Sequence, residues 1–387
     1  MRPAPRIAYV NYGSQSGVTT NIGDGLRRLG HPVEHLDVSD ALALRIPGTR
    51  LPRPTPRVLF SLAASIAEFR GQALDYRWNT AFAFDVHSAR AGRLLQALPE
   101  PAQAVLQNGA LFAPGRPPRL PYVLLLDNTC ALSMNQPAAP EGGLGEHIRF
   151  SDRWMRRETE TYRAAHAIAT FSSVVKQSLV GDYGIDPGRV HVVGAGANVF
   201  PDRVDRRDDG ETLLFVGKDF RRKGGQVLLR AFARLRERRP RARLWIAGPR
   251  ELLALPEGAT CLGLVPFSAL PDLFAQATAF VLPTLREPFG IAFLDAMACG
   301  VPCVGTRVGA VPETLDEGKL GLLVPPGDER ALADALAQLL ENPQRARDLG
   351  ALGREKIIQR GLRWPEVSQR VAVLLERAAL QGNLRAA

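Results

Sequence analysis

The segment 286–306 comes after an apolar run and contains a tight turn followed by a helix. This pattern suits the binding of an anion. Pro288 and Gly290 shape the turn, and a helix is predicted from about Ile291. The backbone amides near Phe289, Gly290 and Ile291 would then lie at the positive end of the helix dipole. Such a helix start is a ready anion site, and the pattern favours a diphosphate there.

Two carboxylates, Glu287 and Asp295, accompany this helix start. Because a carboxylate beside a phosphate would repel it, both are better assigned to hydroxyl groups. Asp295 lies one turn below Ile291 on the same helix face, within reach of a ribose hydroxyl. Glu287, at the mouth of the turn, would meet a sugar beyond the phosphates. The alternative is a capped helix with two incidental acids.

Residues 213–232 form a second predicted strand, loop and helix. Four cationic side chains lie close together in its loop, just before a pair of glycines. They are Lys218, Arg221, Arg222 and Lys223. Cations on a flexible glycine-rich loop suit a leaving diphosphate and neutralise charge as Mg²⁺ does elsewhere. Lysine is rare in this chain, which otherwise uses arginine, so the two lysines here favour a role as compact point charges. The alternative is a solvated basic turn.

The composition indicates an ordinary globular protein, because 45% of the 387 residues are hydrophobic and 23% are charged. The length predicts two or three domains. No apolar run reaches the roughly 18 residues of a membrane span, and the start lacks a secretory leader pattern. We therefore expect a cytoplasmic protein, with peripheral contact to the inner membrane face left open. The net charge of +10 suits anionic lipid, phosphorylated substrates or nucleic acid, or reflects only an arginine-rich surface.

The cysteine and histidine patterns offer no metal site. The four cysteines (Cys130, Cys261, Cys299 and Cys303) contain no CxxC pair, so we expect buried thiols. No HExxH pair and no Asp-x-Asp occur, so we expect neither a metal nor a cofactor. Gly194-Ala195-Gly196 lacks the third glycine of a nicotinamide site, and there is no Walker loop.

Both halves of the chain alternate short apolar runs with helical patterns, which indicates parallel βαβ units. In the first half we expect strands at 6–10, 32–38, 81–86, 104–109, 122–128, 167–171 and 190–194, and helices at 21–29 and 152–165. In the second half we expect strands at 213–217, 243–248, 260–265, 279–284, 302–306 and 321–326, and helices at 226–236, 291–299 and 331–340. The charged stretch 200–210 is the best linker. The pattern predicts an α/β fold of two Rossmann-like domains, residues 1–199 and 211–363, facing across a ligand cleft.

The two motifs, in this order and about 70 residues apart, resemble the retaining GT-B glycosyltransferases of family 4, also called glycosyltransferase group 1. Three further stretches are similar to the family: SGVTTNIGDGLRRLGHPVEHLDV (16–38), ATFSSVVKQSLVGDYGIDPGRVHVVGAGANV (169–199) and VGAVPETLDEGKLGLLVPPGD (308–328). The resemblance covers roughly residues 5–30 and 155–365. It implies metal-independent transfer of a sugar from a UDP- or GDP-sugar to an acceptor hydroxyl, with retention of configuration and no cofactor.

The resemblance also implies roles for the motif residues. Lys218 and Lys223 would hold the diphosphate, with Lys223 and Glu287 acting in catalysis and Asp295 on the ribose. Val265, beside Leu264, would lie near the base. The remaining donor contacts would come from Phe289, Gly290, Ile291 and a first-domain loop, Gly13–Thr19, that includes Gly17. The acceptor would be a glycan, a lipid-linked sugar or a small molecule, and the helix over 364–387 would pack back on the first domain.

Two departures from the family pattern keep a second hypothesis open. The acidic motif of the family ends in Glu, whereas this chain has Asp295. Many members place a His near the reacting carbon, whereas this chain offers Asp127, with His87 as an alternative. The second hypothesis is a catalytically weak protein that binds nucleotide-sugar or a membrane surface on the same fold. A nucleic-acid role is disfavoured because the charges lack interleaved aromatics.

Overall fold

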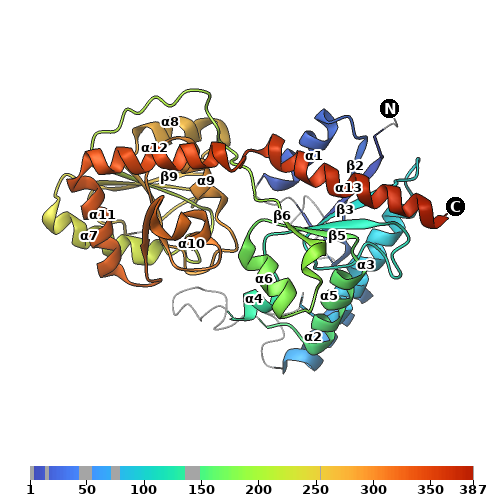
Figure 1. The fold of residues 1–387 in the computed structure, drawn as a ribbon. Coiled ribbons are helices and arrows are strands. Elements are labelled where there is room, and N and C mark those ends of the chain that lie inside the picture. The colour runs from blue at the N-terminus through green and yellow to red at the C-terminus, as the bar shows by residue number, and fades with distance from the viewer. Residues whose placement is uncertain are drawn as a thin grey trace. The chain divides into compact units, whose positions relative to one another are not determined.

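A computed structural model describes residues 4–13, 17–42, 55–70, 79–135, 149–252 and 254–386. The chain divides into two compact units. The first contains the described residues up to 135, residues 149–194 and the C-terminal residues from 365 onward, and the second contains 195–364. Figure 1 shows in each unit a sheet with helices on both faces.

The first unit is built on a six-stranded parallel sheet in the order β2-β1-β3-β4-β5-β6. Its strands are β1 (Ile7–Asn11), β2 (Val33–Asp37), β3 (Ala104–Asn108), β4 (Tyr122–Leu126), β5 (Ala167–Thr170) and β6 (Val190–Val192). The central strands β1, β3, β4 and β5 are buried along their whole length, as expected for a parallel sheet covered on both faces. The strand order reverses between β1 and β3, the kind of position where such sheets bind ligands.

The helices of the first unit follow its strands along the chain, and one further helix of this unit comes from the C-terminal end of the chain. They are α1 (Val18–Arg28), η1 (Ser39–Leu42), α2 (Pro56–Phe69), α3 (Ala81–Gln96), α4 (Cys130–Asn135), α5 (Asp152–Ala164), α6 (Ser173–Gly181), η3 (Pro187–Arg189) and α13 (Trp364–Ala386). Arg370 of α13 donates to the carbonyl of Val193 at 2.8 Å, and His31 lies 3.4 Å from Glu376. The C-terminal helix is thus an integral part of the first unit.

The predicted strand at 81–86 is wrong, because these residues begin helix α3. Thr80 caps the helix by accepting from the amide of Ala83 at 3.1 Å. Buried residues then recur at helical spacing over Phe84, Ser88 and Ala91. The six residues AFAFDV, of which the first four alternate between Ala and Phe, are compatible with either period. The longer amphipathic pattern that follows favours the helix.

The second unit repeats the plan, with a six-stranded parallel sheet in the order β12-β11-β10-β7-β8-β9. Its strands are β7 (Thr212–Val216), β8 (Arg243–Ala247), β9 (Ala259–Gly263), β10 (Ala279–Leu282), β11 (Cys303–Thr306) and β12 (Gly321–Val324). Its helices are α7 (Gly225–Arg238), η4 (Phe267–Ala269), α8 (Leu270–Gln276), α9 (Ile291–Ala298), α10 (Val311–Thr314), η5 (Asp316–Gly318), α11 (Glu329–Glu341) and α12 (Pro343–Gln359). The predicted α/β class with two parallel sheets is confirmed.

The stretch 200–210, expected to be a linker, is attached to the second unit. The guanidinium of Arg206 donates to the carbonyls of Phe274 at 3.3 Å and Ala277 at 2.7 Å. The same group pairs with Asp208 at 3.1 Å. These contacts hold the stretch against α8 and the strand that follows it.

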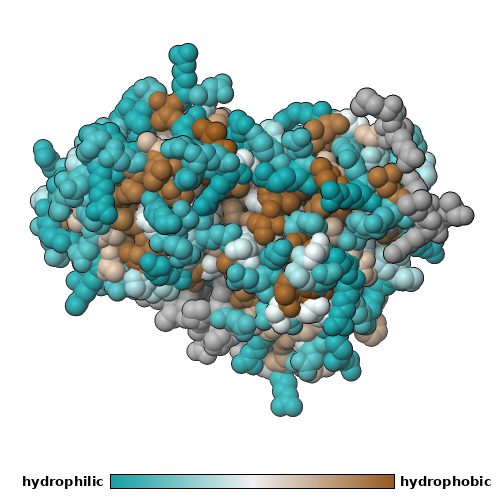
Figure 2. Space-filling view, in the orientation of Figure 1, coloured by the Kyte–Doolittle hydropathy of each residue, from teal (hydrophilic) through white to brown (hydrophobic). Residues whose placement is uncertain are grey.

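The surface is that of an arginine-rich globular chain. Hydrophilic residues predominate on the face that Figure 2 shows, with hydrophobic residues dispersed among them. Across the described ranges, no helix is both apolar enough and long enough to cross a bilayer.

Candidate functional site

Two loops of the second unit lie side by side at the carboxyl edge of its sheet. One follows β7 and leads into α7, and the other follows β10 and leads into α9. Because β7 and β10 are neighbours, both loops leave the sheet at the same place. The amide of Leu285 donates to the carbonyl of Arg222 at 3.0 Å, and the Arg222 guanidinium donates to the carbonyl of Arg286 at 2.7 Å. The two sequence motifs therefore form one site.

Lys223 and Glu287 are the centre of this site. The Lys223 Nζ donates to the Glu287 carboxylate at 2.8 Å, and the side chains are 16% and 9% exposed. Arg222 places a second cation 3.9 Å from the same carboxylate. Two predicted site residues, 64 positions apart in the sequence, are thus joined in a half-buried ion pair. The Lys223–Glu287 pair is neutral as a whole, and Arg222 also pairs with Asp219 at 3.1 Å. The remaining cations of the loop, Lys218 and Arg221, leave the site net positive toward a phosphate.

Glycines at this edge permit close packing. A Cβ on Gly217 would lie 2.3 Å from the Cδ of Lys223, so the lysine stem crosses directly over this glycine. A Cβ on Gly224, whose φ is +74°, would lie 1.8 Å from the carbonyl oxygen of Pro283. The loop was expected to be flexible because of its glycines, whereas they let the two loops touch. Gly217 is a site residue that the sequence pattern does not single out.

The start of α9 has the predicted form. Gly290 precedes the helix with a φ of 91°, and no side chain caps it. Because Gly290 has no side chain that could cap the helix, the amides of Ile291 and Ala292 remain suited to an anion. Phe289 is buried. A Cβ on Gly309 would lie 1.8 Å from the carbonyl of Glu287, so the β11 loop packs tightly behind the turn.

Asp295 is turned toward a backbone segment of its own unit. Its Oδ1 accepts hydrogen bonds from the amides of Asn198 at 2.6 Å and Val199 at 3.0 Å. Burial raises the pKa of Asp295 to about 7, although these amide bonds act to lower it. Asn198 is in turn held by Trp364, whose indole donates to its side-chain oxygen at 3.1 Å. Asp295 thus ties α9 to the start of the second unit, and its assignment to a ribose hydroxyl stays a prediction.

The other predicted donor residues of the second unit lie along the same edge. Lys218 is exposed and follows β7. Gly248, at the end of β8, packs so closely that a Cβ would lie 2.9 Å from the Lys218 amide. Val265 is half-buried beyond β9, beside the exposed Leu264. Since the sheet order is β10-β7-β8-β9, the predicted sugar, diphosphate and base positions follow one another along this edge.

The predicted residues of the first unit lie near the carboxyl ends of its strands or on α3. Gly17, with a φ of 82°, begins α1 after β1, while residues 14–16 of the Gly13–Thr19 loop lie outside the described residues. Asp127 is half-buried directly after β4. His87 is buried in α3, and its ring centroid is 5.0 Å from that of Tyr12. Burial lowers the pKa of His87 to about 4, so its imidazole is neutral at pH 7.

All four cysteines carry free thiols. Three of them are buried, and Cys261 is partly buried. In the portion of the chain that the structure describes, no three His, Cys, Asp or Glu side chains gather as metal ligands.

Comparison with known proteins identifies the second unit most clearly. A model of the family described as "Glycosyl transferases group 1" matches residues 210–342. The chain is similar to the D-inositol 3-phosphate glycosyltransferase of Pseudarthrobacter chlorophenolicus, with 36% identity over 50% of this chain and 53% of the relative. The matches cover 53%, 64% and 47% of the first three curated relatives, so the chain spans about half their length.

The solved structures show the fold of the whole chain. It is similar to a sucrose-phosphate synthase from Thermosynechococcus elongatus, with a TM-score of 0.68 and 20% identity over 96% of this chain and 98% of that one. It is also similar to Anabaena HepE in complex with UDP and glucose, with a TM-score of 0.63 and 15% identity over 96% and 99% of the two chains. The predicted GT-B fold class is confirmed, and the predicted resemblance to glycosyltransferase group 1 is confirmed over residues 210–342.

Proposed function

We propose that the protein transfers a sugar from a nucleotide-diphosphate sugar to an acceptor hydroxyl group. The observation that carries this proposal is the ion pair of Lys223 and Glu287 beside the uncapped start of α9. The match of residues 210–342 to glycosyltransferase group 1 supports it. The similar Anabaena structure that holds UDP and glucose supports a uridine or related nucleotide as the carrier.

In this proposal the donor diphosphate binds between Lys223, Lys218 and the first amides of α9. Lys223 then exchanges part of its contact with Glu287 for the phosphate oxygens, and Glu287 accepts a hydrogen bond from a sugar hydroxyl. The nucleotide base rests near Val265. Asp295 is assigned to the ribose, which requires its carboxylate to exchange a hydrogen bond from the Asn198 or Val199 amide for one from the ribose hydroxyl. Charge-assisted contacts of this kind are short and strong, and their geometry is preformed here by the packed glycines.

Catalysis would come from positioning and from charge neutralisation. Negative charge grows on the leaving diphosphate as the glycosidic bond breaks, and Lys223 lies where it stabilises that charge. No metal or cofactor has a role in this scheme. The family pattern adds retention of configuration, with the leaving phosphate accepting the proton of the acceptor hydroxyl on the same face. The first unit supplies the acceptor site, and Asp127 is its candidate near the reacting carbon.

Lys223→Ala tests the proposal. The alanine should reduce kcat/KM by about a thousandfold, roughly 4 kcal/mol of transition-state stabilisation, while the fold persists because Arg222 still faces Glu287. Lys319→Ala is the matched control, since that side chain is 76% exposed on the same unit. Thermal shift with a panel of UDP- and GDP-sugars identifies the donor beforehand. Near-normal turnover in Lys223→Ala would refute the assignment to the phosphates.

A second candidate is a catalytically weak protein that binds nucleotide-sugar. The hydrogen bonds that Asp295 accepts from the amides of Asn198 and Val199 favour it, because a carboxylate with a structural role is less available to the donor. Transfer or donor hydrolysis by the purified protein distinguishes the two. Binding of the donor without either reaction would favour this second candidate.

A further inference from the structure

Helix α2 carries its large apolar side chains on the outside. Leu59, Phe60 and Ile66 are 62%, 65% and 55% exposed, whereas the serines Ser61 and Ser65 of the same helix are buried. A surface helix of a globular protein normally has the reverse arrangement, with apolar residues toward the core and polar residues toward water. The outward side of α2 is therefore suited to an apolar environment that the first unit itself does not supply.

The exposed apolar residues of α2 form one continuous stripe. Because each residue turns the helix by about 100°, five exposed residues fall within roughly 120° of its circumference. They are Leu59, Phe60, Ala63, Ile66 and Ala67, and we call them the outer face of α2. The two charged residues of the helix, Arg57 and Glu68, lie outside this arc. The outer face is thus apolar along most of the helix.

The first unit holds α2 at its periphery, as Figure 1 shows, and leaves the outer face open. The helix packs against α3 and η1. The ring centroid of Phe60 lies 6.4 Å from that of Phe82 in α3. Phe60 nevertheless has the largest exposed fraction of the three large apolar residues, so this neighbour does not cover it.

Helix α13 of the same unit shows how an ordinary surface differs from this one. Val373 and Leu380 are exposed on α13, but so are Glu376 and Arg377 on the same side of the helix. The apolar residues of α13 are therefore interrupted by charges, as is usual for a face in contact with water. On α2 no charge interrupts the outer face.

The charge of the chain distinguishes two apolar partners for the outer face, a second copy of the chain and a lipid bilayer. Each copy carries a net charge of +10, so pairing two copies would bring like charges together. The sequence from Arg45 to Arg77, which contains α2, has six arginines against one Glu and one Asp. An anionic membrane surface attracts a segment of this charge. Charge complementarity therefore favours the bilayer.

We propose that the outer face of α2 inserts into the surface of a bilayer that contains anionic lipids. A helix with one apolar side lies in the plane of the interface, with that side between the headgroups and the acyl chains. At about 1.5 Å per residue α2 is roughly 21 Å long, which is less than the roughly 30 Å core of a bilayer, so it lies on the membrane. The exposed arginines near its two ends, Arg57 and Arg70, carry charges that suit the headgroup phosphates.

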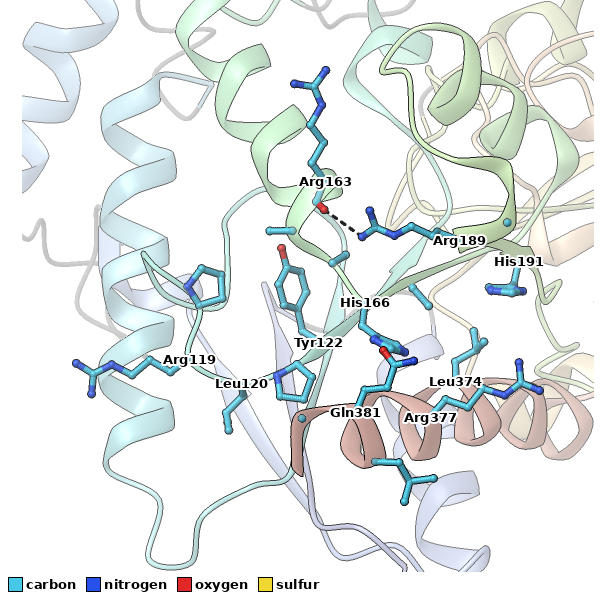
Figure 3. Close-up of a pocket in the computed structure, with 18 residues that line it drawn as sticks. Arg119, Leu120, Tyr122, Arg163, His166, Arg189, His191, Leu374, Arg377 and Gln381 are labelled. Atoms are coloured by element: carbon cyan, nitrogen blue, oxygen red, sulfur yellow. Dashed lines mark hydrogen bonds between the residues drawn. The ribbon is translucent and has the colours of Figure 1, made fainter. Parts of the chain in front are cut away.

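The cavity shown in Figure 3 does not compete with α2 as a lipid site. It lies beside α13 in the first unit and has a volume of about 1090 Å³. The guanidinium groups of Arg119 and Arg163 point away from it in Figure 3. Its arginines therefore do not converge on a headgroup.

Sedimentation of the full chain with vesicles tests the inference. Vesicles of phosphatidylcholine and phosphatidylglycerol should bind the protein at least about tenfold more tightly than vesicles of phosphatidylcholine alone. Leu59→Gln/Ile66→Gln should weaken binding to the mixed vesicles at least about tenfold, because apolar area is lost while the charge is kept. Both side chains are more than half exposed and Gln is a good helix former, so the variant should fold normally, which circular dichroism checks.

Val373→Gln/Leu380→Gln is the matched control. It replaces two exposed apolar residues of the same unit at the same spacing of seven positions, and it should keep vesicle affinity within about twofold. Because Leu380 lines the cavity of Figure 3, the control also measures any binding through that cavity.

A third variant separates insertion from adsorption by charge alone. In Phe60→Trp, the fluorescence of the added tryptophan should shift to shorter wavelength on the mixed vesicles. Lipids brominated on their acyl chains should quench this emission, because the outer face contacts those chains.

Four results would overturn the inference. They are no binding to the mixed vesicles, equal weakening by both double variants, no quenching in Phe60→Trp, or self-association without vesicle binding that Leu59→Gln/Ile66→Gln abolishes. The last result would assign the outer face to a second copy of the chain. Sugar transfer is not part of any readout, so the outcome is independent of the proposed function.

Discussion

Asp295 offers a stability test that follows directly from its surroundings. Its side chain is 4% exposed, and its contacts are the amides of Asn198 and Val199. Burial raises its pKa from 3.8 to about 7. The native state therefore holds a proton on this group in a pH range where the unfolded chain has lost it. Since the native state binds more protons there, the free energy of unfolding falls as pH rises from about 4 to about 7.

The magnitude follows from the difference between the two pKa values. About 3 pKa units, at about 1.36 kcal/mol each, amount to roughly 4 kcal/mol across the whole window. Between about pH 5 and pH 7.5, roughly 3 kcal/mol of this falls within the measurement. Asp295→Asn keeps the size and a hydrogen-bond acceptor but cannot ionise. Relative to the native protein, the variant should therefore gain roughly 3 kcal/mol of stability over this pH range.

Urea unfolding, followed by tryptophan fluorescence at the two pH values, measures this gain. Trp364 donates to Asn198 and so reports on the segment that Asp295 holds. Asp202→Asn, at an exposed position, is the control and should leave the difference constant. If the free energies of unfolding of Asp295→Asn and of the native protein differ by the same amount at pH 5 and at pH 7.5, the carboxyl group ionises normally and the argument from burial fails.

Three further predictions concern the candidate site. Glu287→Gln should lower kcat by at least about a hundredfold with little change in donor affinity, because in the proposed scheme the carboxylate acts on the sugar while Lys223 still binds the phosphates. Steady-state kinetics and a titration of the donor measure the two quantities, and a rise in the donor Kd larger than the fall in kcat would contradict this division of roles. Gly224→Ala should lower the free energy of unfolding by at least about 2 kcal/mol, since its Cβ would lie 1.8 Å from the Pro283 carbonyl. Gly327 also has a positive φ, +79°, but has open space around it, so Gly327→Ala should lower the free energy of unfolding by only about 1 kcal/mol. Equal losses for the two variants in chemical denaturation would contradict the packing argument. Prolonged EDTA treatment should leave the transfer rate within about twofold, and restoration of a lost rate by added Mg²⁺ would exclude the lysine-based scheme.

Much of the fold was predictable because its signals are local. Short buried strands bounded by polar residues stand out in the sequence, and each predicted strand other than 81–86 coincides with an observed one. Helix α12 carries a weaker pattern over Pro343–Gln359, and the sequence does not predict it. The error at 81–86 has the same origin, because a run of six residues contains too few repeats to separate a period of 2 from one of 3.6.

The sequence by itself determined which residues are candidates for the chemistry, because a turn, a helix start and a set of charges are specified within about twenty positions. Only the tertiary structure decided which of them meet. Lys223 contacts Glu287 because β7 pairs in parallel with β10, which brings two distant loops to one edge. Asp295 faces the amides of Asn198 and Val199 for the same kind of reason: its partners are about a hundred positions away, and no local pattern encodes that distance.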